Sequence, residues 1–275
     1  MPSRTRDRRV GAPARALAAL QARIVACARC PRLVAHRRAV AVSPPRRFRG
    51  ERYWARPVPS LGRLGARLLL VGLAPAAHGG NRTGRMFTGD ATGGSGEWLA
   101  RALDAHGFAT RPTSRRRGDG FRLLDAYITA AIHCAPPMNR PLPGELANCI
   151  RYLEAELRLQ RSVRVVIALG RVGFDAYLRA MAALGKRTRP RPRFAHGAAV
   201  ILPWDVTLLA SYHPSRQNTQ TGKLTWPMFE AVFADARRYL GPARTRSQST
   251  ARVAARASRA TASAGRAHAR SFGAS

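Results

Sequence analysis

Short apolar runs alternate with longer segments of helical periodicity along the central part of the chain. The apolar runs predict strands over residues 67–73, 126–132, 163–169, 199–202 and 207–211. The periodic segments predict helices over residues 97–106, 145–159, 173–183 and 226–240. Strands that alternate with helices in this way favour an α/β fold with a parallel sheet.

Ligands of such sheets bind beyond the carboxyl ends of the strands, where the loops open. In this chain those loops begin at Ala74, His133, Arg171 and Tyr212. Three of the four loops hold unusual combinations of glycine, histidine, cysteine and asparagine. We therefore expect the functional site at this edge of the sheet.

The two ends of the chain differ from this pattern. Residues 1–23 hold six arginines and one acid, and residues 242–275 hold seven arginines and no acid among small residues. We expect a basic N-terminal extension over 1–23, a folded domain over 24–241 and a disordered tail over 242–275, since neither end has the composition of a core.

The charge of the chain narrows the classes of function. There are 48 Lys and Arg against 14 Asp and Glu among 275 residues, a net charge of +34. A GC-rich genome explains the use of Arg rather than Lys, but it does not explain the shortage of acids. The predicted domain keeps +22, which excludes most metabolic enzymes and indicates a polyanion such as nucleic acid.

The apolar runs are too short to cross a membrane, which takes about 18 residues or more. We expect a cytoplasmic, nucleoid-associated protein that has no membrane contact. Because the sequence carries no signal for oligomerisation, we expect a monomer.

The four cysteines form one candidate metal site. Cys27 and Cys30 are spaced C-x2-C, whereas Cys134 follows a predicted strand and Cys149 lies in the next predicted helix. Zinc or an iron–sulfur cluster suits four thiolates, and unrelated buried thiols are the alternative. The wide second spacing favours a 4Fe-4S cluster with a structural role, because a zinc ribbon normally has two short knuckles.

Three loops hold the remaining candidate chemistry. Residues 72–90 are rich in glycine, match no nucleotide-binding pattern and offer backbone amides to an anion, although such a loop is often only a turn. His213 follows a strand and suits a donor to a developing anion, although single loop histidines are often surface residues. Asn139, five residues after Cys134, suits recognition of a base edge or a simple turn.

Together these loops and the cysteine spacing resemble the uracil-DNA glycosylase superfamily, and within it the type-5, or family B, branch. The resemblance covers about residues 24–241. It implies a three-layer α/β/α domain with a central parallel sheet. It also implies a structural 4Fe-4S cluster on Cys27, Cys30, Cys134 and Cys149, and hydrolysis of the N-glycosidic bond of damaged bases without a small-molecule cofactor. Other branches offer Asp or Asn where this chain has Ala74, and type-5 members share that lack.

The resemblance leads to a hypothesis for each site residue. Breaking the glycosidic bond leaves an anionic base, which His213 and the amides near Ala74 would stabilise. Phe87 would stack on the extruded base and Asn139 would bind its edge. Asn81, ranked first, or Asp90 would position water. Ser215, Arg216 and Gln217 would hold the strand and fill the vacated stack.

The expected partners are double-stranded and single-stranded DNA that contain damaged bases. Residues 129–131 have no amide side chain where other branches read uracil, so hypoxanthine and xanthine are further expected substrates. The alternative function is an iron–sulfur or zinc DNA-binding redox sensor without catalysis, which leaves the glycine-rich and His213 loops unexplained. A nuclease is disfavoured because it needs clustered carboxylates.

Overall fold

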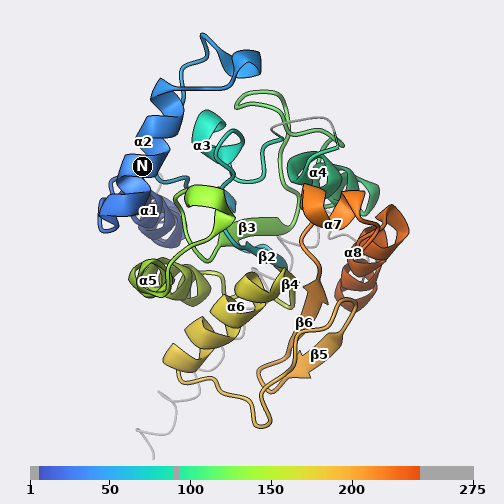
Figure 1. Ribbon diagram of the computed structural model, residues 1–275. Coiled ribbons are helices and arrows are strands. Elements are labelled where there is room, and N and C mark those ends of the chain that lie inside the picture. Colours follow the sequence, from blue (N-terminus) through green and yellow to red (C-terminus); the bar gives the residue numbers. More distant parts are fainter. Residues whose placement is uncertain (1–5, 90–92, 242–275) are drawn as a thin grey trace, which may run out of the picture. The chain divides into compact units, whose positions relative to one another are not determined.

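A mixed sheet forms the centre of the computed structural model, which describes residues 6–89 and 93–241 (Figure 1). Within this part of the chain the strand order is β1-β3-β2-β4-β6-β5. The strands are β1 (Leu61–Gly62), β2 (Leu68–Gly72), β3 (Ala126–Ala130), β4 (Val165–Leu169), β5 (Ala199–Leu202) and β6 (Val206–Ser211). Strands β3, β2, β4 and β6 are parallel, as predicted, whereas β1 and β5 pair antiparallel at the two edges.

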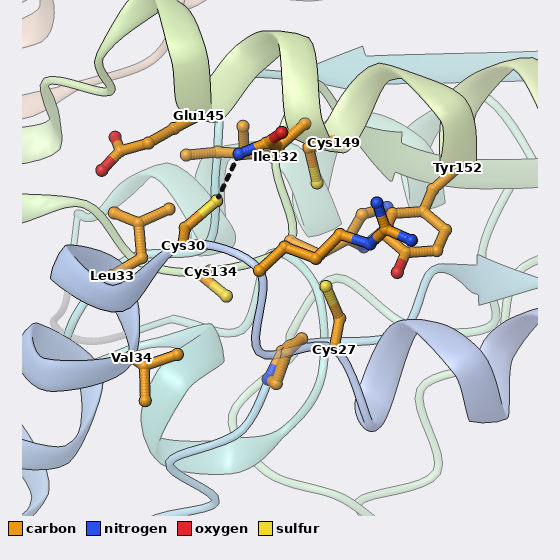
Figure 2. Close-up of a pocket in the computed structure, with 13 residues that line it drawn as sticks. Cys27, Cys30, Leu33, Val34, Ile132, Cys134, Glu145, Cys149 and Tyr152 are labelled. Atoms are coloured by element: carbon orange, nitrogen blue, oxygen red, sulfur yellow. Dashed lines mark hydrogen bonds between the residues drawn. The ribbon is translucent and has the colours of Figure 1, made fainter.

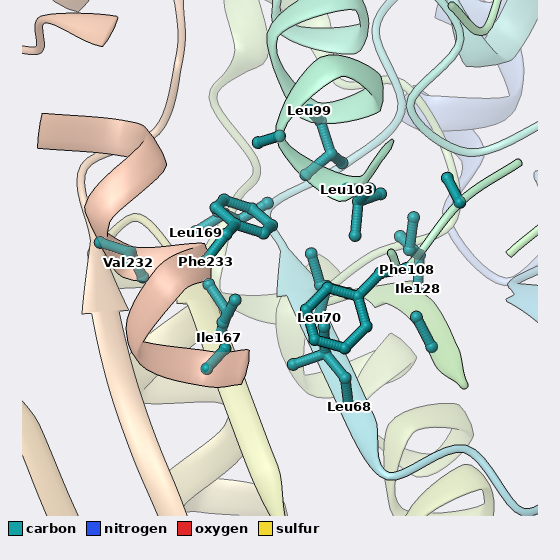
Figure 3. Close-up of a cluster of buried hydrophobic side chains, with 14 of the residues drawn as sticks. Leu68, Leu70, Leu99, Leu103, Phe108, Ile128, Ile167, Leu169, Val232 and Phe233 are labelled. Atoms are coloured by element: carbon teal, nitrogen blue, oxygen red, sulfur yellow. The ribbon is translucent and has the colours of Figure 1, made fainter. Parts of the chain in front are cut away.

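Two apolar layers explain why the central strands are almost continuously hydrophobic. Successive side chains point to opposite faces, so Leu68 and Leu70 pack in one cluster and Leu69 and Val71 in the other. The first cluster also contains Leu103 and is drawn in Figure 3. Helices therefore cover both faces of the sheet, which confirms the three-layer arrangement.

The helices that cover the sheet begin and end within about two residues of their predicted positions. Helices α4 (Ser95–Ala105) and α8 (Trp226–Leu240) pack on one face, and α5 (Pro143–Leu159) and α6 (Arg171–Ala183) pack on the other. None of the helices within residues 6–89 and 93–241 is long and apolar enough to span a bilayer.

The N-terminal helix α1 (Arg6–Val25) differs from the prediction of an extension outside the core. Leu20 and Ile24 are buried against Tyr152 of α5. The side chain of Gln21 donates hydrogen bonds to the hydroxyl of Tyr127 and to the carboxylate of Glu156. The many arginines concealed a helical stripe of apolar residues, and this stripe makes α1 part of the folded unit. The predicted tail, 242–275, lies outside the described residues.

Four elements of five residues or fewer, and a 12-residue helix with only two buried side chains, were not predicted because they lack a periodic apolar pattern. They are α2 (Pro31–Val42), α3 (Gly80–Thr83), α7 (Arg216–Gln220) and the 3-10 turns η1 (Arg46–Phe48) and η2 (Pro137–Asn139). Three of them, α3, η2 and α7, lie in the loops that follow β2, β3 and β6. They shape the edge of the sheet where we expect the site.

Candidate active site

A cleft of about 420 Å³ lies beyond the carboxyl ends of β2, β4 and β6. Its walls come from the loop after β2, the first turns of α4 and α6, and the loop after β6. Six of the predicted site residues line it: Ala74, Phe87, Asn139, His213, Ser215 and Arg216. Segments more than 140 residues apart in the sequence therefore meet in one cleft, as the parallel topology predicts.

The imidazole of His213 is held in a weakly hydrated wall of this cleft. Desolvation lowers its pKa to about 4, so the ring is neutral at neutral pH. The loop around it is fixed from two directions. The side chain of Asn218 donates a hydrogen bond to the His213 carbonyl oxygen at 2.8 Å, and the hydroxyl of Ser95 donates to the carbonyl oxygen of Pro214 at 2.7 Å.

The ring of Phe87 lies beside this imidazole, with 6.2 Å between the ring centroids and 35° between their planes. Phe87 occupies the left-handed region of backbone conformation, at φ 49°. A bulky side chain adopts that region only under constraint. Its ring packs on Gly72, where a Cβ atom would lie 2.7 Å from the ring, so this glycine makes room for the ring.

Two helix N-termini also open into the cleft. Gly94 to Gly96 of α4, and Gly170 to Val172 of α6, line its wall. The first N–H groups of a helix lack partners within the helix and carry partial positive charge, which favours anions. Sequence reasoning located the loop at Arg171 but gave it no role, because the donors belong to the backbone and leave no mark in the residue types.

The loop that carries Phe87 is braced from behind by a buried ion pair. Arg85 binds both carboxylate oxygens of Asp119 at 2.7 and 2.8 Å, and it also donates to the hydroxyl of Ser114. Asp119 accepts three backbone N–H bonds as well, so the arginine and these donors hold the pKa of its carboxyl group far below the usual range. Neither partner was singled out in the sequence, because no local spacing connects residues 34 positions apart.

Asn81 does not line the cleft. It is buried on α3, and its side-chain amide donates a hydrogen bond to the carbonyl oxygen of Arg37 at 3.1 Å. The prediction that it positions water does not agree with this location, because the amide joins α3 to α2. Gln217 is exposed on α7 beside the cleft rather than in its wall, and Asp90 lies outside the described residues.

The four cysteines line a second, smaller pocket (Figure 2). Cys27 and Cys30 come from the turn between α1 and α2, Cys134 follows β3, and Cys149 lies on α5. All four are free thiols, and the pocket between them is otherwise mainly apolar, with Leu33 and Ile132 in its walls. The side chain of Asn148 donates to the sulfur of Cys30 at 3.7 Å.

The chemistry of this pocket fits a cationic group shared by four sulfurs. Burial and the neighbouring thiols raise the pKa of Cys134 to about 12 and raise that of Cys149 as well. Ionised thiolates would therefore need a compensating charge. Among the described residues, no three His, Cys, Asp or Glu side chains are arranged to hold a single metal ion.

The chain is similar to known proteins over most of its length. Residues 59–237 match the model of the uracil DNA glycosylase superfamily. The chain is 53% identical to the type-5 uracil-DNA glycosylase of Thermus thermophilus over 218 residues, which cover 79% of this chain and 95% of that protein. It is 46% identical to the type-5 enzyme of Mycobacterium tuberculosis over 81% of each chain. It is 49% identical to that of Pyrobaculum aerophilum over 74% of this chain and 84% of the relative.

Proposed function

The chain belongs to the uracil DNA glycosylase superfamily, and from this premise we propose that it hydrolyses the N-glycosidic bond of uracil in DNA and so starts base excision repair. The observation that carries the proposal is the pair of Phe87 and neutral His213, which lie together in a cleft lined by two helix N-termini. The match to the superfamily model, over residues 59–237, includes every residue that lines that cleft.

Recognition begins with a base that has left the duplex, since the bond cannot be reached inside the stack. Phe87 offers an aromatic face for the extruded ring, and the exposed amide of Asn139 at the rim of the cleft hydrogen-bonds to its edge. The backbone beside Ala74 passes close to the base because this position carries only a methyl group. Stacking and hydrogen bonding together orient the bond that breaks.

The chemical step creates negative charge on the base. As the bond between C1′ and N1 breaks, its electron pair stays with the pyrimidine and the sugar becomes cationic. Neutral His213 donates a hydrogen bond to the developing oxyanion, and the free N–H groups of α4 add to the favourable potential. Water then bonds to C1′ and releases a proton, which the departing base takes up.

Water activation contributes less in this proposal than stabilisation of the leaving base. In the segments that the structure describes, no carboxylate lines the cleft. Asp90 and Asn81 stay predictions for the group that positions water, although the Asn81 amide donates to the carbonyl oxygen of Arg37 and does not line the cleft. Ser215, Arg216 and Gln217, on α7 and at its start, are proposed to hold the DNA backbone.

We also propose that the cysteine pocket holds a structural 4Fe-4S cluster on Cys27, Cys30, Cys134 and Cys149. Such a cluster supplies positive charge to four thiolates and needs no part in bond cleavage. Bound to these residues, it would join the turn between α1 and α2 to β3 and α5. The hydrogen bond from Asn148 to the Cys30 sulfur supports this role.

The substrate range is proposed to include the deaminated purines hypoxanthine and xanthine. Thr129 on β3 is fully buried, and its hydroxyl donates to the carboxylate of Glu156 at 2.6 Å. It is not among the residues that line the cleft, and neither are Ala130 and Ala131. Without a side-chain amide from this strand, the cleft has fewer groups that demand the uracil edge.

The proposed partner is damaged DNA in double-stranded or single-stranded form, bound by a monomer in the nucleoid of the cytoplasm. The net charge of +22 on residues 24–241 supports attraction to a phosphate backbone. The redox-sensor alternative is not favoured, because it assigns no role to the cleft, which six of the expected site residues line.

The decisive experiment is incubation of the purified protein with a duplex that contains one uracil, followed by alkali. We expect free uracil by mass spectrometry and strand breaks only after alkali. Parallel duplexes with hypoxanthine or xanthine test the wider range. Breaks before alkali indicate a lyase or nuclease, and binding without any base release supports the sensor.

A further inference from the structure

A strained turn lies at the rim of the cleft, directly after two prolines. Met138 has φ 52° and ψ 25°, and Asn139 has φ 56°, so two successive residues other than glycine occupy the left-handed region. Only six such residues occur in the described part of the chain, and a third, Phe87, lines the same cleft. Strain of this kind persists where the surrounding structure imposes it, often at functional sites.

The strained turn presents an apolar side chain to solvent. Met138 is 80% exposed. Seven large hydrophobic side chains are exposed among the described residues, at positions 42, 124, 138, 142, 201, 228 and 239. Met138 is the one among them that directly adjoins a residue of the cleft wall in the sequence, namely Asn139. An unbranched, flexible thioether adapts to irregular apolar gaps.

Extrusion of a base leaves such a gap. Unless the gap is filled, the neighbouring bases lose their stacking contacts, and apolar side chains are the groups that proteins insert between base steps. In the loop on the other side of the cleft the apolar Pro214 is buried and the residues 215–221 are polar, and Ser215 already caps α7 by accepting a hydrogen bond from the N–H of Asn218.

We propose that Met138 enters the base stack at the position that the extruded base leaves. The inference rests on the proposed glycosylase function, and it makes Met138 a positioning residue, not a catalytic one. Two adjacent residues of one turn then have different roles. Asn139 binds the extruded base, and Met138 occupies the place that this base has left in the stack. The residues at 215–217 then hold the backbone, and Met138 takes the place in the stack that the sequence analysis assigned to them.

The test compares Met138→Ala with Met138→Leu and with Leu142→Ala, an exposed apolar control in the same loop that does not adjoin the cleft. Each variant is assayed on three duplexes, with uracil opposite adenine, opposite guanine or opposite an abasic analogue. Extrusion of the uracil becomes easier from the first duplex to the third. We expect Met138→Ala to lower kcat/KM by about tenfold opposite adenine and less along the series. Met138→Leu and Leu142→Ala should stay within about twofold of wild type. A 2-aminopurine next to the target should show weaker fluorescence enhancement with Met138→Ala.

An equal loss on all three duplexes would overturn the proposal, because it would mean that Met138 acts only by positioning Asn139. No loss on any duplex would overturn it as well. Failure of the proposed function has a different appearance, since the wild-type protein would then release no uracil from any of the three substrates. Circular dichroism spectra of the variants verify that the fold is retained.

Discussion

The cleft and the cysteine pocket differ in the chemical groups that form their walls. The cysteine pocket gathers four thiols from three distant segments, in mainly apolar walls. The cleft has few reactive side chains, and much of its wall is glycine and backbone from two helix N-termini. The cysteine pocket is characterised by the type of its side chains. The cleft is characterised by the position of its backbone dipoles and by the desolvation of His213.

The two regions meet in one loop. Cys134 lines the cysteine pocket, and Asn139, five residues later, lines the cleft. Between them Pro136 and Pro137 restrict the backbone. The proposed functions therefore assign the stability of the fold to the cysteine pocket and the reaction to the cleft, and this loop connects the two regions.

Replacing Cys134 by Ser is expected to have the largest effect. If the pocket holds a cluster, losing one sulfur ligand should lower the thermal midpoint by on the order of 10 °C and remove visible absorbance. Val34→Ala is the control, since it removes a wall residue of the same pocket but no sulfur. Calorimetry and absorbance spectra measure both. A stable, fully active Cys134→Ser protein would show that this pocket does not maintain the fold.

Replacing His213 by Ala should have the next largest effect. In contrast to the cysteine replacement, it should lower activity and leave thermal stability almost unchanged. We expect kcat/KM for uracil release to fall by about 10² to 10³, because a donor to the anionic base is lost. The thermal midpoint should change by no more than about 3 °C, because the side chain lies in the wall of the cleft and belongs to neither apolar cluster of the sheet. His106→Gln, at the far end of α4, is the matched control. A loss of less than about threefold would remove His213 from the mechanism.

The smallest expected effect is that of pH. The pKa of His213 is about 4 in the folded protein and near 6.5 in an unfolded chain, so the unfolded chain binds the proton first as pH falls. Its contribution to stability is complete above pH 6.5 and is lost between pH 6.5 and 4. The free energy of unfolding of His213→Gln, measured by denaturant titration, should therefore fall less steeply with decreasing pH in that window than that of wild type. Parallel curves would contradict a lowered pKa.

A large part of the fold was predictable from sequence, because buried strands and amphipathic helices leave strong patterns. The run at 165–169 is an example. Helix α1 was missed because arginines surround its apolar stripe. In the site, the candidates His213 and Phe87 could be selected from their residue types and their positions after predicted strands. The donors at the start of α6 were not, because a backbone N–H belongs to every residue except proline. The location of Asn81 depends on a contact with α2, which no local pattern encodes.

Helix α1 has a consequence for the order in which the protein can mature on the ribosome. Its buried residues rest on α5, and the pocket that contains Cys27 is closed by Cys149 on that same helix. The end of α5 is synthesised 134 residues after the end of α1, a delay on the order of ten seconds at typical rates of translation. During that interval the first two cysteines have no completed site. The earliest helix to be made therefore has no partner for its apolar residues until α5 has been synthesised.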